Sequence, residues 1–405
     1  MSKPLHLFEA FGVELEYMIV DKETLEVKPI ADELFKAMTG KYTGDFENGM
    51  ITWSNELTLH LIELKCTQPE NDLEQLRLSF RANVRQINKE LTQWSAMLLP
   101  TAAHPLMDPS KHAKLWPHDN GDVYARYNEM FNCKGHGWSN LQSTHLNLPF
   151  HGDDEFGRLH AAIRVLMPLL PALCASSPVL NKKVTKYLDA RLSYYQENQK
   201  SIPSITGNVI PEAIFTKAEY EKQIYKKIAK DIAPFNKDNL LDPVWVNSRG
   251  AMARFDRGSI EIRVMDIQEC PSVDIAIQSF VIESLRLLVD EKLCSYQQQK
   301  NISTDTLKEI YDETIYWGTD VTVYDKPYLT LFEVSDVCPV RDLLQKLLDE
   351  MGSQPWSSTI EAILKHGNLA NRILADLKGK PTTRAIQNTW RRLADCLQND
   401  TMFIP

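Results

Sequence analysis

Two glutamates separated by one residue lie in a stretch that otherwise has the composition of a buried strand. In FGVELEYMIV, residues 11–20, Glu14 and Glu16 fall on the same face, because successive side chains of a strand alternate between its two sides. Two carboxylates this close repel each other unless a positive group lies between or above them. Such a pair is ordinarily a solvated outer face, but Met18 and Val20 make the same face partly apolar. A cation bound between the carboxylates is the alternative.

Two other predicted strands also carry ionisable or polar side chains on one face. Glu261 and Arg263 share a face in SIEIRVMD, and His145 and Asn147 share a face in QSTHLNLP. Each has an ordinary explanation. Glu261 and Arg263 can form ion pairs across an exposed sheet, and a lone histidine is more often a hydrogen-bonded structural residue than a ligand.

Glu56 and Glu63 flank a further predicted strand in SNELTLHLIELK. Their separation is odd, so a regular strand would place them on opposite faces. Either Glu56 lies on the loop that enters the strand, or a bulge intervenes. Carboxylates with one imidazole form the ligand set expected for Mg²⁺ or Mn²⁺. The four segments together therefore favour a divalent-cation site, with solvated faces as the open alternative.

The elements that must position these side chains are strands with intervening helices of uneven length. An amphipathic helix is predicted over 70–98, and a β-hairpin over 251–266, where Asp256-Arg257-Gly258 supplies a turn. The remaining predicted elements are a strand, a helix and a strand within 1–66, a strand over 141–150, helices over 155–175 and 272–293, and mainly helical spacing over 303–398. This order predicts an α+β fold, with helices on one face of an antiparallel sheet.

The composition indicates a soluble globular protein with enough apolar residues for a sizeable core. Of its 405 residues, 43% are hydrophobic and 24% charged, and the net charge of −9 argues against a broad nucleic-acid-binding surface. The first ten residues lack the pattern of a signal peptide, and the longest apolar tract, residues 165–175, is too short to span a bilayer. The seven scattered cysteines form no CxxC pair, which favours reduced thiols. We expect a cytoplasmic protein that binds neither nucleic acid nor membrane.

The common nucleotide-binding loops are absent from the sequence. There is no GxxxxGK[ST] motif, and no GxGxxG follows a predicted strand. Any ATP site must therefore bind the phosphates with groups other than a glycine-rich loop.

Several segments, in order along the chain, resemble the glutamate–cysteine ligase type 2 family of carboxylate–amine ligases, which is related to glutamine synthetase. They are FGVELEYMIVD, HLIELKCTQP, THLN, LCASSPVLNKK, LDARLSYYQ, SIEIRVMDIQECPSVDIAI and ILKHGNLANRIL. Each segment alone is a weak signal, whereas the ordered set covers most of the chain. The chain departs from the family pattern at Ser143, where glycine is usual, and at Asn147, where a second histidine is usual. These departures bear on substrate identity more than on the metal site.

The resemblance implies an α+β funnel, floored by an antiparallel sheet of about six strands with helices on its outer face. It implies a catalytic core over residues 1–300 and a helical region over 301–405 packed on that core. It also implies that ATP and two or three Mg²⁺ or Mn²⁺ ions bind at the waist of the funnel. The implied ion ligands are Glu16, Glu56 and Glu63 near the amino-acid substrate, and Glu14, His145 and Glu261 near the ATP phosphates.

The resemblance also assigns roles outside the ion ligands. Arg263 matches the family arginine that reaches the transferring phosphoryl group. The expected catalytic residues are Arg263, Glu261 and Glu63; the expected ATP-site residues are Arg263, Glu14 and Glu261; and the expected substrate contacts are Arg126, Arg191 and Asn147.

The implied reaction is ATP-dependent amide formation. The acid is first phosphorylated to an acyl phosphate, and an amine then displaces phosphate. Glutamate, through its side-chain carboxylate, and cysteine are the expected substrates, giving γ-glutamylcysteine. The alternatives are a ligase of the same mechanism with another acid or amine, and a family member that binds nucleotide without turnover. The expected partners are small molecules, with a homodimer left open.

Overall fold

The computed structural model describes residues 4–405 and contains one large antiparallel sheet. From one edge to the other, its strands are β2 (Asp45–Asn48), β3 (Ile51–Asn55), β4 (Leu61–Cys66), β1 (Gly12–Asp21), β6 (Ser143–Pro149), β10 (Ser259–Asp266) and β9 (Ala251–Arg254), and β5 (Ala96–Leu99) also pairs with β1. Every pairing in this sheet is antiparallel. The α+β class is therefore confirmed, but the sheet has eight strands rather than about six.

The strands that the sequence analysis missed are short. β2 and β3 form a hairpin in which Asn48 lies opposite Ile51, and Gly49 in its turn has a φ of +69°. Gly49 and Met50 are the two turn residues, and a glycine at the first of them suits the positive φ needed there. β5 overlaps the end of the range predicted as helix 70–98, and the helix α2 ends earlier, at Leu91.

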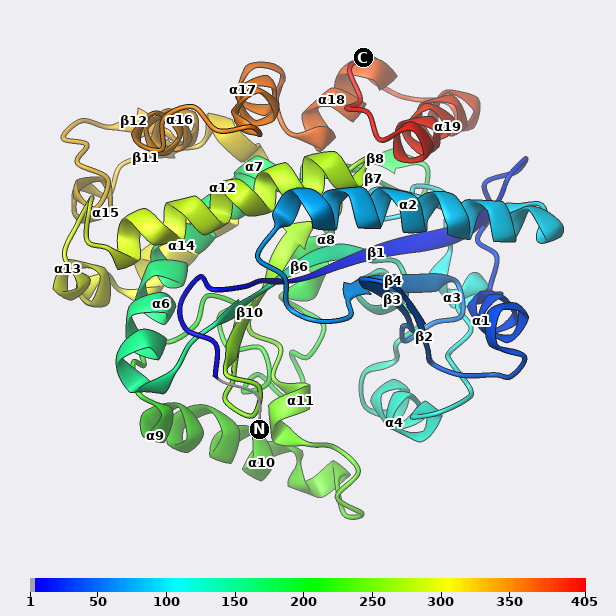
Figure 1. The fold of residues 1–405 in the computed structure, drawn as a ribbon, viewed down its shortest axis with the longest axis horizontal. Coiled ribbons are helices and arrows are strands. Elements are labelled where there is room, and N and C mark those ends of the chain that lie inside the picture. Colours follow the sequence, from blue (N-terminus) through cyan, green and yellow to red (C-terminus); the bar gives the residue numbers. More distant parts are fainter. Residues whose placement is uncertain (1–3) are drawn as a thin grey trace.

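Helices cover one face of the sheet. Figure 1 shows α2 (Leu73–Leu91) and α12 (Pro271–Val289) side by side above β1, while α4 (Gly121–Phe131) and α10 (Lys226–Ile232) lie on the other side of the sheet. Val13, Leu15, Tyr17 and Ile19 of β1 are completely buried in the core on the helical side. The predicted alternation therefore leaves Glu14 and Glu16 on the opposite face, away from these helices.

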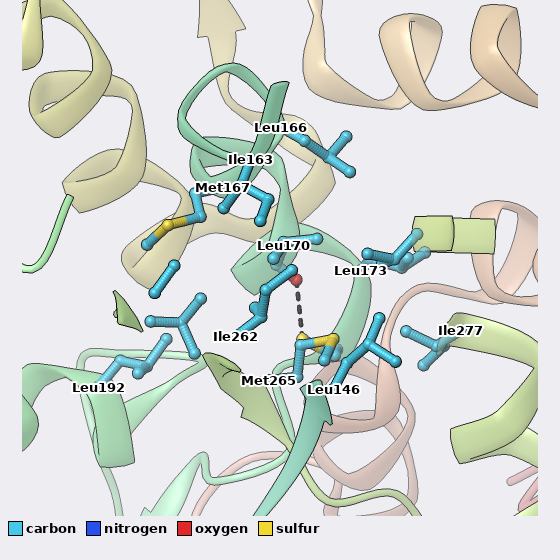
Figure 2. Close-up of a cluster of buried hydrophobic side chains, with 14 of the residues drawn as sticks. Leu146, Ile163, Leu166, Met167, Leu170, Leu173, Leu192, Ile262, Met265 and Ile277 are labelled. Atoms are coloured by element: carbon cyan, nitrogen blue, oxygen red, sulfur yellow. Dashed lines mark hydrogen bonds between the residues drawn. The ribbon is translucent and has the colours of Figure 1, made fainter. Parts of the chain in front are cut away.

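A second part of this core lies behind β6 and β10. In Figure 2, Leu146 of β6 and Ile262 of β10 lie among apolar side chains of a helical run that includes Leu170 and Leu173. This run consists of α6 (Gly152–Leu166), a 3₁₀ turn (Met167–Leu169) and α7 (Leu170–Cys174). It is long and apolar enough to be a membrane-span candidate, yet 94% of its most apolar window is buried inside the fold. Burial of this kind is what a core helix shows.

The remaining helices lie around the cavity side and in the C-terminal part of the chain. They are α1 (Ala31–Thr39), α3 (Pro109–His112), α5 (His136–Ser139), α8 (Ala190–Tyr195), α9 (Lys217–Tyr220), α11 (Pro243–Val246), α13 (Tyr296–Asn301), α14 (Thr304–Trp317), α15 (Lys326–Thr330), α16 (Val340–Glu350), α17 (Ser357–His366), α18 (Leu369–Leu377) and α19 (Thr383–Asn399). Two small hairpins complete the fold: β7 (Val179–Leu180) with β8 (Lys183–Val184), and β11 (Thr322–Val323) with β12 (Cys338–Pro339). The predicted helical C-terminal region is confirmed.

The C-terminal helices cover one end of the sheet on the face that carries the glutamates. Met18 and Val20 are fully buried in a core that includes Ile373 of α18 and Trp390 of α19. The apolar end of β1 thus lies beneath these helices, while the end with Glu14 and Glu16 lies open to a cavity. Side chains from both 1–300 and 301–405 share the two main cores, and a boundary at residue 300 stays a prediction.

Candidate active site

A cavity of about 1260 Å³ lies on the sheet face that carries Glu14 and Glu16. Its floor is made by side chains of β4, β1, β6 and β10, and its walls by loops and short helices that include Tyr127, Tyr195 and Trp245. All but one of the residues expected at the site line it: Glu14, Glu16, Glu56, Glu63, His145, Asn147, Arg191, Glu261 and Arg263. Arg126 does not line this cavity.

The strand register explains why residues far apart in the chain meet here. Glu16 lies directly opposite Glu63 of β4, and Glu14 lies opposite His145 of β6. Asn147 of β6 in turn lies opposite Glu261 of β10. Directly opposed side chains on one face of a sheet lie within contact range.

Glu16, Glu56 and Glu63 form the first carboxylate group. Each offers an oxygen within 4.8 Å of the others. Glu56 follows the last residue of β3 and so lies on the loop that leads to β4, which confirms the loop alternative and removes the need for a bulge. Burial, and then the negative charge of Glu16, raises the pKa of Glu56 to about 7. Burial and the charges of Glu14 and Glu56 raise the pKa of Glu63 well above its usual value.

Glu14, Glu63 and His145 form the second group, again with ligand atoms within 4.8 Å of one another. His145 Nδ1 lies 2.8 Å from Glu14 Oε2. Burial would raise the pKa of Glu14, but the hydrogen bond and charge of His145, together with the charge of Arg263, outweigh burial and lower that pKa to about 2. Glu261 lies farther out, with Oε1 3.8 Å from His145 Nδ1. Glu63 thus belongs to both groups, a sharing that the sequence analysis did not anticipate.

The donor set of the two groups fits divalent ions that prefer oxygen. The first group brings three buried or half-buried carboxylates together, and the nearest lysine, Lys65, lies 3.5 Å from Glu63. Glu16 accepts hydrogen bonds from the Ser143 backbone N and Oγ at 2.6 and 2.9 Å, which orient it without neutralising it. Burial and the repulsion between neighbouring carboxylates raise the pKa values of Glu56 and Glu63, and Mg²⁺ or Mn²⁺ would offset this concentration of negative charge.

Arg263 projects into the cavity beside Glu261. Its Nε lies 3.5 Å from Glu261 Oε1 but makes no hydrogen bond, and Nη1 contacts the Met252 sulfur at 3.5 Å. The pairing of β10 with β6 is irregular between Ile262 and Met265, so Arg263 lies within a bulge. Its side chain is 28% exposed. The guanidinium is therefore largely free to bind an anion.

Arg191 lines the inner part of the cavity and is held from behind. Its Nε donates to the buried carboxylate of Asp266, and its Nη atoms lie 3.4 and 3.5 Å from the Arg263 carbonyl oxygen. Asp266 also accepts a hydrogen bond from the Ser176 backbone N at 2.8 Å. The Arg191 side chain is only 1% exposed, so its contact with an anionic substrate stays a prediction.

Arg126 lies elsewhere, so its position does not support the expected substrate contact. It lies on α4 and forms a bidentate pair with Asp238, at 3.1 and 2.9 Å, and it donates to the Phe235 carbonyl oxygen at 2.7 Å. This pair lines a separate surface depression of about 420 Å³. Helical spacing explains the difference: Tyr124 and Tyr127 of the same helix face the cavity, and Arg126 falls on the other side.

Asn147 is engaged with a predicted ion ligand. Its Nδ2 donates to Glu14 Oε1 at 3.0 Å. Gly12 lies directly opposite, and a Cβ at that position would come within 3.0 Å of the Asn147 Cβ. Glycine therefore makes room for an amide that orients Glu14, while a substrate contact of Asn147 stays a prediction.

Sequence reasoning missed two features of the cavity. Lys65 lies on the cavity face of β4, and its position two residues after Glu63 could have revealed it. Tyr127 packs edge-on against Trp138 and Trp245, with ring centroids 5.6 and 5.0 Å apart, and all three line the cavity. They come from three separate helices, α4, α5 and α11, so no periodic pattern in the sequence predicts that they meet.

Comparisons with known proteins place this chain in a family. A model of glutamate-cysteine ligase family 2 (GCS2) matches residues 10–391. An uncharacterised protein of Archaeoglobus fulgidus is 31% identical over 398 residues, 97% of this chain and 100% of that protein. A protein of Bradyrhizobium sp. strain BTAi1, provisionally named glutamate–cysteine ligase 2, is 26% identical over 276 residues, 66% of this chain and 59% of that protein.

Solved structures share the fold at low sequence identity. The glutamate–cysteine ligase of Francisella tularensis, solved in complex with AMP, has a TM-score of 0.61 at 14% identity, covering 98% of this chain and 90% of that chain. A bifunctional glutathione synthetase of Pasteurella multocida has a TM-score of 0.59 at 13% identity, covering 97% of this chain and 52% of that chain. The family model extends over nearly the whole chain, so this protein belongs to glutamate–cysteine ligase family 2.

Proposed function

We propose that this protein is an ATP-dependent carboxylate–amine ligase that joins the side-chain carboxylate of glutamate to cysteine. The family membership supports a ligase, and its name supports this substrate pair. The observation that carries the proposal is the pair of ligand groups that share Glu63, with Arg263 free beside them in one cavity. A set of closely spaced carboxylates next to a guanidinium that makes no hydrogen bond to a carboxylate suits a triphosphate bound with divalent ions.

The residues divide the chemistry between them. Mg²⁺ or Mn²⁺ held by Glu16, Glu56 and Glu63, and by Glu14 and His145 with Glu63, would neutralise charge on the transferring phosphoryl group. Glu261, on the adjacent strand, lies at the edge of the second group and holds Arg263 near it.

Arg263 and Arg191 act on the substrates. Arg263 donates to phosphoryl oxygens as negative charge gathers on them, and Arg191 grips an acid group of the amino-acid substrate. The carboxylate of the substrate attacks the terminal phosphorus of ATP, and ADP leaves. The amine then attacks the acyl carbon of the acyl phosphate, inorganic phosphate leaves, and the ammonium proton is lost to solvent.

A second candidate is the same reaction with a different amine or acid. It is favoured by the placement of Arg126, which pairs with Asp238 and so removes one of the two arginines expected to grip anionic substrates. Glutamate and cysteine each carry an α-carboxylate, and Arg191 is then the only one of those two arginines at the cavity.

A coupled ADP-release assay with glutamate and a panel of amines, with and without Mg²⁺, tests these candidates. Mg²⁺-dependent ADP release that requires cysteine supports the first candidate, and a requirement for another amine supports the second. Glu63→Gln should abolish the Mg²⁺-dependent release, and Glu47→Gln, which changes an exposed glutamate of β2 on the same sheet, is its matched control. Saturable ATP binding without turnover on any pair would contradict both candidates.

A further inference from the structure

Among the described residues that line the cavity, Lys65 is the one lysine. It lies on β4 directly opposite Glu14 of β1, so its side chain leaves the sheet on the same face as the two ligand groups. Its Nζ lies 3.5 Å from Glu63 Oε2 and 3.4 Å from Asp45 Oδ1. No role assigned so far accounts for an ammonium group at this place.

The strand register puts Lys65 in one row with Arg263. Lys65 lies opposite Glu14, Glu14 lies opposite His145, and the bulged pair of β10 that contains Arg263 lies beside His145, between the pairs Ile262–Leu146 and Met265–Thr144. The row therefore begins and ends with a cation. Across three strand intervals its ends are about 14 Å apart. Two long side chains that lean inward over such a row can meet a ligand between them.

The two ends are built alike. Lys65 follows Glu63 by two residues, as Arg263 follows Glu261, and each cation lies 3.5 Å from the glutamate that precedes it on its strand. In both cases the glutamate is buried and the cation partly exposed, at 37% for Lys65 and 28% for Arg263. The sheet thus carries a glutamate with a neighbouring cation on both sides of His145: Glu63 with Lys65 on β4, and Glu261 with Arg263 on β10.

Lys65 is free to turn toward a ligand. Both of its ion-pair distances exceed the usual range of a charge-assisted hydrogen bond. Asp45 is 66% exposed and bonds to Ser54 Oγ, so its attraction for Lys65 is screened by water. A lysine on a flexible four-carbon stem can reorient at small energetic expense.

We propose that Lys65 binds the phosphate groups of ATP from the side of the cavity opposite Arg263, so that the two cations form a two-sided phosphate clamp. The proposal rests on the proposed function, since it requires that the cavity bind ATP. A compact ammonium is suited to a phosphate oxygen as a point charge, whereas Arg263 can engage two oxygens at once. The alternative role of Lys65 is to neutralise Glu63 and Asp45 without touching the nucleotide.

Calorimetric binding of a non-hydrolysable ATP analogue and of AMP, each with Mg²⁺, separates these roles in the Lys65→Met variant. The clamp predicts roughly 10- to 100-fold weaker binding of the ATP analogue, the size expected when one charged hydrogen bond is lost. AMP, which lacks the terminal phosphates, should bind within about threefold of the wild type. Lys65→Arg should restore most of the affinity for the ATP analogue.

Lys346→Met is the matched control. Lys346 of α16 is also partly exposed and also lies near two carboxylates, Glu333 and Glu350, but far along the chain from the sheet and outside the cavity. It should leave nucleotide binding unchanged. Wild-type affinity of Lys65→Met for the ATP analogue, or an equal loss for the analogue and AMP, would overturn the clamp alone. Absence of nucleotide binding by the wild-type protein would overturn the proposed function and the clamp together.

Discussion

The buried carboxylates of the cavity floor and the buried carboxylate of Glu269, beyond the end of β10, are treated differently by the fold. Glu269, three residues after β10, is completely buried, but it pairs with Arg372 of α18 and accepts a hydrogen bond from the Phe403 backbone N at 2.9 Å. Glu16 and Glu63 are nearly as buried, and neither has an arginine partner among the described residues. The Glu269–Arg372 pair ties α18 to the segment that follows β10.

The difference in pairing indicates a structural role for Glu269 and a ligand-binding role for Glu16 and Glu63. A buried carboxylate that is paired makes the loss of its partner strongly destabilising, so the pair holds two elements together. A buried cluster whose negative charges are only partly offset by nearby cations destabilises the protein until a metal ion binds, a pattern concentrated at functional sites. The carboxylates of the cavity floor are therefore the ones expected to bind cations and substrates.

The largest effect is expected for Glu63→Gln. Because Glu63 belongs to both ligand groups, its loss weakens both ion sites at once, and turnover should fall roughly 10³-fold or more. The protein should stay folded, since the amide also relieves repulsion from Glu14 and Glu56. Steady-state ADP release at limiting Mg²⁺ measures this, with Glu47→Gln as control. Near-wild-type turnover would show that Glu63 is not a ligand.

Arg372→Met should act on stability. It leaves the buried Glu269 without its partner, and the free energy of unfolding should fall by about 3–5 kcal/mol, as measured by urea unfolding. Adding Glu269→Gln to the same chain should recover part of the loss, because an amide is easier to bury than an unpaired carboxylate. If Arg372→Met unfolds at the wild-type urea concentration, the proposed division between paired and unpaired charge is wrong.

Arg263→Lys should lower kcat about 10²-fold, with little change in the apparent affinity for ATP. The guanidinium can donate two hydrogen bonds to phosphoryl oxygens as charge develops, and a lysine cannot reproduce that geometry. Steady-state kinetics and a melting curve on this variant decide between two roles. A role limited to neutralising Glu261 predicts an unchanged kcat and, at most, a lower Tm.

The smallest expected effect is a pH dependence of the metal-free protein. The pKa of Glu56 is raised from 4.5 to about 7 on folding, so the folded state binds more protons than the unfolded state between these values. The Glu56 contribution is thus favourable to stability at low pH and is lost as pH rises from about 4.5 to 7. Glu56→Gln should flatten the stability curve in that window, and saturating Mg²⁺ should do the same. An unchanged slope in Glu56→Gln would contradict the assignment.

The side chains of the cavity floor could be predicted from the sequence, because residues two apart on a strand lie on the same face. Alternation alone places Glu14 with Glu16 and Glu261 with Arg263, and the structure keeps these pairs on the cavity face. Met18 and Val20 obscured the pattern, since they share the face of the glutamates. Burial under α18 and α19 explains them, and contacts so distant in sequence leave no local signal.

The walls of the cavity were not predictable in the same way. The resemblance assigned Arg126 a substrate contact, but its direction depends on how α4 is rotated and on Asp238, a residue far along the chain. The sharing of Glu63 depends on the β1–β4 register, which opposes Glu63 and Glu16, and on the loop that carries Glu56. Register and loop path are set by tertiary packing, which a single sequence does not display.

Calorimetric titration of the protein with Mn²⁺ tests most directly whether the unpaired carboxylates form an ion site. We expect saturable binding near pH 6.5 with release of protons, because Glu56 is partly protonated there until an ion displaces its proton. Glu63→Gln should weaken binding at both groups, whereas Glu47→Gln should bind as the wild type does. Mn²⁺ binding that is unaffected by Glu63→Gln, or the absence of any saturable binding, would contradict the assignment of this cavity as a metal-dependent active site.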